Sequence, residues 1–148
     1  MDMPHPKLDI RVVDSVAGIG PGVWNALSAG RPFQGYRWYR YGEAVLSDCA
    51  PAHILVSRDG EPVARATFWL KRQEWWLPFS SRLVRYGLEK FIQHNPFFVC
   101  EAPLVCAPGL ALTDDPPLQK AALGMIADNA LELCGKNRAS FVIFGYIQ

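Results

Sequence analysis

Residues 115–147 have the sequence DPPLQKAALGMIADNALELCGKNRASFVIFGYI, and this stretch decides the fold. Asp115 is a favoured residue immediately before a helix, and Pro116 suits the first helical position, where the amide needs no partner. Helical spacing then continues to about Cys134, and we expect Gly135 to end the helix. Its predicted apolar face consists of Leu118, Ala122, Met125, Ile126, Ala130 and Leu133.

The segment after this helix, Ser140–Ile147, is apolar at nearly every position. Such a run predicts a strand that is covered on both faces, typical of a parallel central strand. Together with a preceding strand, the helix and this strand would form a right-handed crossover unit. The last third of the chain therefore predicts an α/β architecture.

A β-hairpin is the clearest local signal in the middle of the chain. His53–Ser57 and Val63–Lys71 flank a turn that contains Asp59-Gly60, a pair favoured where both central residues have positive φ. The second strand alternates, and its length predicts a central position in the sheet. Ala64, Ala66, Phe68 and Leu70 are expected on one face, and Arg65, Thr67, Trp69 and Lys71 on the other.

The remaining segments complete the predicted order of elements. Leu8–Val13 alternates as a half-buried strand, and Val23–Ala29 and Tyr36–Leu46 have the spacing of helices. Ser81–His94 is predicted to be a helix with Leu83, Tyr86 or Gly87, and Phe91 inward and Arg82, Arg85, Glu89 and Lys90 outward. Phe97–Cys106 is predicted to be a strand broken by Pro103. This order predicts an α/β (α+β) fold with a mixed central sheet flanked by helices.

Length and composition indicate one globular domain, residues 1–148, with a flexible terminus at residues 1–7. Half of the residues are hydrophobic and the formal net charge is +1, without a basic block that would favour nucleic acid. The N-terminus has no apolar core of signal-peptide length and no apolar run in the chain is long enough to span a membrane, so we expect a cytoplasmic protein that is not transmembrane. The four cysteines lack metal-ligand spacing, which favours free, buried thiols in a reducing compartment over a disulfide.

Several short motifs occur in a characteristic order along the chain. Trp24-Asn-Ala-Leu27 is followed by Pro32-Phe33-Gln34 and Trp38, then by Arg58-Asp-Gly and by Pro108-Gly109-Leu110 before the long helix. This order resembles the N-terminal half of the Fem-like and cellulose-biosynthesis-type acyltransferases of the N-acetyltransferase (GNAT) superfamily. The resemblance implies a GNAT-like half-fold and transfer of an acyl or aminoacyl group to an amine, often on an envelope precursor. It also implies a cleft shared with a second such domain, which contributes much of the chemistry.

Two departures from that pattern bear on function. The Gly-rich turn that cradles acyl-CoA phosphates is absent, because the matching turn is Leu110–Pro117 and contains Asp114 and Asp115, which would repel a pyrophosphate. Further strands would also be expected beyond Gln148. We therefore expect that the chain is not catalytic alone, with acyl-CoA implied by the resemblance only and a second GNAT-like domain or another copy as partner. The alternative is a non-catalytic binding or self-association module with the same half-fold.

Candidate substrate-binding residues form two groups. Tyr39, Arg40 and Tyr41 follow the P-F-Q motif on a helix that the resemblance places beside the cleft, and tyrosine and arginine suit polar ligands and phosphates. Lys71 and Arg72 form a basic-aromatic cluster with Trp75 and Trp76, for which a solvated loop is the alternative. The predicted substrate-binding residues are Tyr39, Arg40, Tyr41, Lys71, Arg72 and Trp76.

No catalytic set is predicted, because nothing in the sequence brings a nucleophile, a base and an acid together. His53 is expected to be structural, and His94 to end a helix, where the helix dipole favours it. Asp115 is expected to cap a helix, and Glu101 to lie on an edge strand. No motif indicates a metal site.

Overall fold

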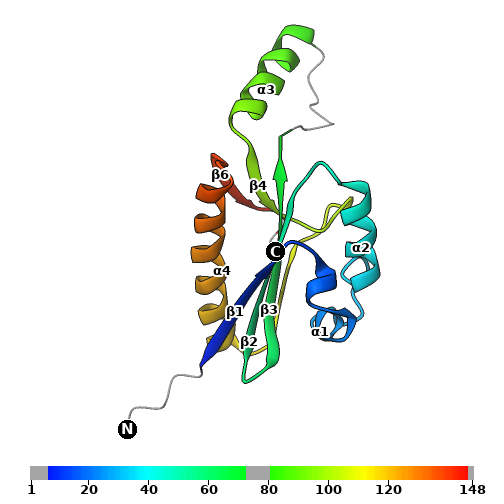
Figure 1. Cartoon of the computed structure of the whole chain (residues 1–148), viewed down its shortest axis with the longest axis vertical. Helices are drawn as coiled ribbons and strands as arrows, with labels where there is room; N and C mark the ends of the chain where they lie inside the picture. Colours follow the sequence, from blue (N-terminus) through cyan, green and yellow to red (C-terminus); the bar gives the residue numbers. More distant parts are fainter. Residues whose placement is uncertain (1–6, 73–80, 147–148) are drawn as a thin grey trace.

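The computed structural model describes residues 7–72 and 81–146, which form a mixed sheet with helices on both faces (Figure 1). The strands are β1 (Leu8–Val13), β2 (Pro51–Arg58), β3 (Glu61–Lys71), β4 (Phe97–Cys100), β5 (Leu110–Leu112) and β6 (Phe141–Phe144). The helices are η1 (Val16–Gly18), α1 (Pro21–Ala26), α2 (Tyr36–Val45), α3 (Arg82–His94) and α4 (Pro116–Lys136). The α/β fold class predicted from the sequence is thus confirmed.

The sheet order among the described residues is β1-β2-β3-β4-β6, with β5 paired to β3 beyond the end of β4. All pairs are antiparallel except β4 and β6, which are parallel and connected through α4. The predicted hairpin is present, with positive φ of 52° at Asp59 and 87° at Gly60. These two angles match a turn whose twist suits the flanking strands.

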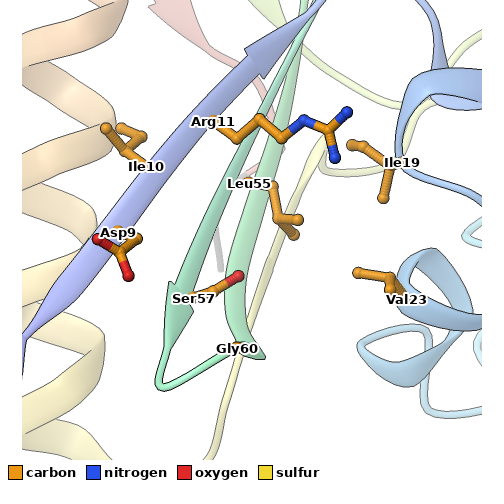
Figure 2. A pocket seen from close by; sticks show the side chains of 8 residues that line it. All are labelled: Asp9, Ile10, Arg11, Ile19, Val23, Leu55, Ser57 and Gly60. Carbon is orange, nitrogen blue, oxygen red and sulfur yellow. The ribbon is translucent and has the colours of Figure 1, made fainter.

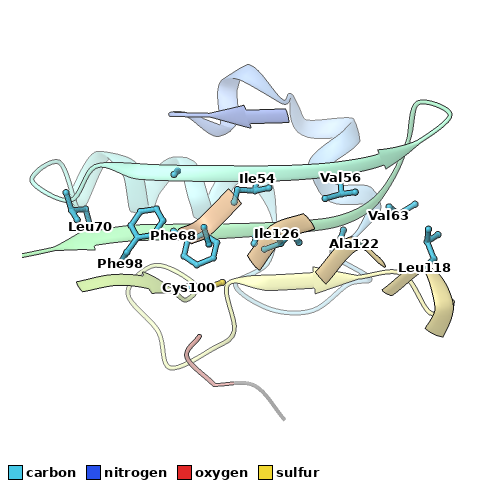
Figure 3. Close-up of a cluster of buried hydrophobic side chains, with 14 residues drawn as sticks. Ile54, Val56, Val63, Phe68, Leu70, Phe98, Cys100, Leu118, Ala122 and Ile126 are labelled. Carbon is cyan, nitrogen blue, oxygen red and sulfur yellow. The ribbon is translucent and has the colours of Figure 1, made fainter. Parts of the chain in front are cut away.

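An apolar core fills the space between the sheet and α4 (Figure 3). Every second residue of β3, from Ala64 to Leu70, faces this helix, because side chains alternate along a strand. Asp115 caps α4 by accepting a hydrogen bond from the Leu118 amide at 3.4 Å, as predicted. The buried residues of α4 are Leu118, Ala122, Ile126 and Ala130, all on the predicted apolar face.

The opposite face of the sheet is covered by α1, α2 and η1, on the other side of the strands from α4 in Figure 1. A second buried cluster lies here and contains Val16, Trp24, Tyr39 and Ala102. Unlike the first cluster, this layer also encloses polar side chains. It positions the candidate site.

Three predictions about element packing were wrong. The β6 strand is not central among the described strands and is not covered on both faces, because Phe141 is 45% exposed and Ile143 40% exposed. The predicted inward side of α3 faces outward, with Leu83 85% exposed, while Ile92 is the buried residue of that helix. Tyr86 and Phe91 are also exposed.

Several boundaries and environments also differ from the predictions. The strand expected at Phe97–Cys106 ends at Cys100, and α4 continues past Gly135 to Lys136. The cysteines are free, as expected, but only Cys100 is buried and Cys106 is exposed. Within residues 7–72 and 81–146, no helix combines the length and the hydrophobicity needed to cross a bilayer.

Candidate functional site: a buried polar network between the sheet and α2

Strands β2 and β3 direct polar side chains toward α1 and α2. His53 of β2 lies directly opposite Thr67 of β3, and Leu55 lies opposite Arg65. Because opposite residues of an antiparallel pair share a face, these four side chains form one row beneath the helices. His53, Thr67 and Arg65 have no exposed surface. Buried polar groups of this kind need internal partners.

Glu43, His53 and Thr67 form a continuous hydrogen-bonded chain. Glu43 Oε1 lies 2.9 Å from His53 Nε2, and His53 Nδ1 lies 2.9 Å from Thr67 Oγ1. The carboxylate also accepts hydrogen bonds from the Val16 amide at 2.6 Å and from the Ser15 hydroxyl at 2.9 Å. This network joins α2 and the segment before η1 to the centre of the sheet.

The environment of Glu43 keeps its carboxyl group ionised. Burial acts to raise its pKa, but the hydrogen bonds from His53, the Val16 amide and Ser15 outweigh burial and lower the pKa to about 2. Arg40 adds an ion pair at 3.0 Å on the solvent side. Glu43 is therefore a fixed negative charge beside the buried imidazole.

Arg65 is a buried cation without a carboxylate partner among the described residues. Its Nη2 donates to the Gln34 carbonyl at 2.8 Å and lies 3.3 Å from the Ser28 hydroxyl. The guanidinium carbon lies 4.2 Å from the centre of the Trp24 ring and 5.4 Å from that of Tyr39. Aromatic faces attract a cation in this geometry and offset part of its desolvation cost.

Three donors in this region lack a hydrogen-bond partner in the part of the chain that the structure describes. They are Arg65 Nε, Arg65 Nη1 and the Tyr39 hydroxyl. Burial raises the pKa of Tyr39 to about 12, although the charge of Arg65 acts in the opposite direction. Burial also lowers the pKa of Arg65, while Tyr39 acts to raise it. Tyr39 is thus a neutral phenol at physiological pH.

The acid–imidazole–hydroxyl order resembles the order of a nucleophilic triad, but the site is closed. Thr67 and His53 have no surface in contact with solvent, so the hydroxyl cannot meet a substrate in this arrangement. Burial raises the pKa of the nearby Cys100 thiol to about 12, which makes that sulfur unreactive. The network as it stands supports structure and positioning rather than covalent catalysis.

A shallow pocket of about 290 Å³ lies beside this network, between β1, β2 and α1 (Figure 2). Its floor includes Leu55, the register partner of Arg65, and its polar groups are Asp9, Arg11 and Ser57. Figure 2 shows the Arg11 side chain extending from β1 toward Ile19. The volume is slightly below the ~300–1,000 Å³ typical of small-molecule sites.

The predicted substrate-binding residues occupy different environments. Tyr39 is completely buried in the network, whereas Arg40 is paired with Glu43 and Tyr41 is 55% exposed beside Trp38. Lys71 forms an ion pair with Glu101, and Arg72 is exposed just after β3. Trp76 lies outside the described residues, as does Trp75. Their role in substrate binding stays a prediction.

Sequence reasoning missed Glu43, Thr67 and Arg65 as members of one site. Arg65 gave the strongest signal, since a charged residue in a strand predicted to be central must find buried partners. His53 was expected to be structural, and its two side-chain hydrogen bonds agree with that role. No group of acidic, histidine and cysteine side chains suitable for a metal occurs within the described ranges. Comparison of the chain with protein-family models, curated proteins and solved structures finds no match.

Proposed function

We propose that this chain is the N-terminal half of a Fem-like or GNAT-like N-acyltransferase of the cytoplasm. It would help to move an acyl or aminoacyl group to an amine on a small molecule or an envelope precursor. Catalysis would require a second GNAT-like domain or another copy of the chain. Nucleic acid is not part of this proposal, because the charged residues are mixed in sign.

One observation carries the proposal: three of the motifs behind the resemblance, those containing Trp24, Gln34 and Pro108-Gly109, meet in space. Trp24 Nε1 donates to the Gln34 carbonyl at 3.1 Å, and Gln34 Nε2 donates to the Pro108 carbonyl at 2.8 Å. Gly109 accepts a hydrogen bond from the Thr67 amide at 2.9 Å. Residues 74 positions apart are thus joined around Arg65. We expect motifs that belong to one family pattern to contact one another in the folded chain. Motifs that match by chance would lie at unrelated places in the structure.

The order of elements is also the order that the resemblance implies. Apart from the short elements η1 and β5, a strand, two helices, a hairpin, a helix, a strand, a long helix and a strand follow one another. The last helix connects the parallel strands β4 and β6. This arrangement supports the half-fold.

The start of α4 supports dependence on a partner. Asp115 occupies the cap and Asp114 precedes it, so two carboxylates stand where a helix N-terminus would otherwise attract phosphate. Acyl-CoA therefore remains possible by resemblance only. The outer edge of β6 has no partner strand within the described ranges, which leaves an edge that a second domain could join.

The test compares the chain alone with the product of the full reading frame that contains it. Acyl-CoA thioesters and an aminoacyl ester are supplied with a panel of amines, and products are identified by mass spectrometry. We expect transfer by the full product and none by the chain alone. Transfer by the chain alone would refute the requirement for a partner, and no transfer by the full product would refute the acyltransferase proposal.

A second candidate function is a non-catalytic self-association module. Phe141 and Ile143 project from the uncovered face of β6, and exposed apolar side chains on an edge strand favour contact with another chain. Light scattering after size exclusion distinguishes this alternative. A stable dimer that Ile143→Lys dissociates would support it, and a strict monomer at high concentration would exclude it.

A further inference from the structure

Helix α3 stands apart from the two layers of the fold. Figure 1 shows it beyond the N-terminal end of β4, away from both α4 and the α1–α2 layer. Every residue from Arg82 to Gly87 is exposed, and Ile92 near its end is the buried residue of the helix. The first two turns are therefore accessible from all sides.

An apolar stripe runs along this accessible helix. Leu83 is 85% exposed, Val84 48% and Phe91 49%, and their spacing places them on one side. The Phe91 ring lies 6.5 Å from that of Phe141, so the stripe ends against the sheet. Large apolar side chains that are gathered and exposed in this way mark an interaction surface.

Basic side chains border the stripe. The helix carries three cations, Arg82, Arg85 and Lys90, against the single anion Glu89, which gives a formal charge of +2 with His94 neutral. Glu89 is paired with Arg85 at 3.0 Å. Lys90 lies 5.7 Å from the centre of the Tyr86 ring. The partner of this surface should be both apolar and negatively charged.

The positive charge of α3 distinguishes between two partners for this surface, a second copy of the chain and a lipid bilayer. A second copy bound through α3 with two-fold symmetry would place the same patch against itself and bring like charges together. An anionic bilayer instead satisfies both features, because its acyl boundary takes the apolar stripe and its headgroups attract the cations.

We propose that α3 is an interfacial helix that binds the surface of an anionic lipid bilayer. Leu83, Val84 and Phe91 enter the boundary between headgroups and acyl chains, while the basic side chains stay at the phosphates. The helix has 13 residues and lies on the membrane without crossing it. This inference is independent of the proposed acyl transfer, because binding is measured without any reaction.

The test is flotation of the intact chain with vesicles. Vesicles made of equal parts of phosphatidylglycerol and phosphatidylcholine are compared with vesicles of phosphatidylcholine alone. We expect binding to the anionic vesicles that weakens as salt is added, because salt screens surface charge. Arg82→Gln should reduce this binding about fivefold, the effect of one surface cation.

A matched pair of substitutions separates α3 from the rest of the surface. Leu83→Glu should reduce vesicle binding at least about tenfold, since it places a charge in the apolar stripe. Leu131→Glu makes the same change at a 63% exposed leucine of α4 and should leave binding unchanged. Circular dichroism confirms that both variants are folded, as expected for such exposed positions.

Absence of flotation with anionic vesicles would overturn the proposal, and so would equal binding by wild type and Leu83→Glu. If wild type does not bind vesicles but forms a protein complex that Leu83→Glu disrupts, α3 is a protein-binding helix instead.

Discussion

The charge of Glu43 depends on partners that only the folded chain supplies. His53, Ser15 and the Val16 amide come from other elements and lower its pKa from an ordinary 4.5 to about 2, although burial acts in the opposite direction. A depressed folded-state pKa stabilises the protein above the unfolded value. That stabilisation is lost as the pH falls through the folded value.

We therefore predict that Glu43→Gln flattens the dependence of stability on pH between 4.5 and 2. The difference in unfolding free energy between wild type and this variant should shrink progressively as the pH falls across this range. The measurement is urea unfolding at a series of pH values, with Glu61→Gln at the exposed start of β3 as control. An unchanged slope in Glu43→Gln would show that the carboxylate is not held by these partners.

Arg65 gives a second prediction, because it is fully buried without a carboxylate partner among the described residues. Removing a buried charge removes its desolvation cost, and buried ion pairs replaced by apolar side chains of similar size are often no less stable. Arg65→Met should therefore unfold within about 1 kcal/mol of wild type, or at higher urea. Arg65→Ala should lose about 2–5 kcal/mol, because it leaves a cavity.

A large loss of stability in Arg65→Met would contradict this prediction. A loss of about 3–5 kcal/mol would mean that the guanidinium contributes more through Gln34 and Ser28 than its burial costs.

The sequence predicted which face of β3 Arg65 occupies, because alternation is local. It did not reveal Gln34 as partner, since loop contacts depend on how distant segments close over the sheet.

At the scale of elements, two glycines in helices have opposite environments. A methyl group at Gly42 of α2 would collide with the Pro103 ring, whereas one at Gly124 of α4 would meet open space. We predict that Gly124→Ala stabilises the protein by about 0.5–1 kcal/mol, because alanine loses less entropy in a helix. Gly42→Ala should destabilise it by about 1–3 kcal/mol through overpacking.

Thermal unfolding of the two glycine variants provides the measurement. Both substitutions add the same atoms to a helix, so their intrinsic helix propensities cancel in the comparison. A stabilising Gly42→Ala would show that α2 is free to move away from Pro103. That result would contradict the close packing of α2 against Pro103.

The predictions from sequence differed in quality between elements for a physical reason. The β2–β3 hairpin and the start of α4 follow from turn and capping preferences of a few adjacent residues, and both are confirmed. The prediction of which side of α3 is buried was wrong, because an amphipathic pattern identifies an apolar stripe but not what covers it. The same holds for β6, where an apolar run did not imply two covered faces.

At the scale of the whole molecule, Phe68 connects three strands in the core beneath α4. Its ring stacks on the Phe98 ring, with 4.9 Å between the ring centroids. It also meets the Phe144 ring edge-on, with 5.4 Å between the centroids. Phe68→Ala should cost about 3–5 kcal/mol, a large share of a typical domain's stability. Leu131→Ala, on the exposed side of α4, should change stability by less than about 0.5 kcal/mol.

Urea unfolding followed by fluorescence and by circular dichroism tests this prediction. The two probes should report one transition if the layers on both faces of the sheet unfold together. A cost below about 1 kcal/mol for Phe68→Ala would contradict a core continuous across β3, β4 and β6.

The sequence by itself determined the α/β class, the order of the longer elements, the hairpin and the helix that Asp115 caps. These features depend on periodicity, turns and caps, which act over a few residues. Only the tertiary structure decided that β6 is an edge strand, that α3 exposes its apolar stripe and that Glu43, His53 and Thr67 meet. The physical reason is that burial and long-range hydrogen bonds depend on which segments pack together, and no local pattern encodes the partner.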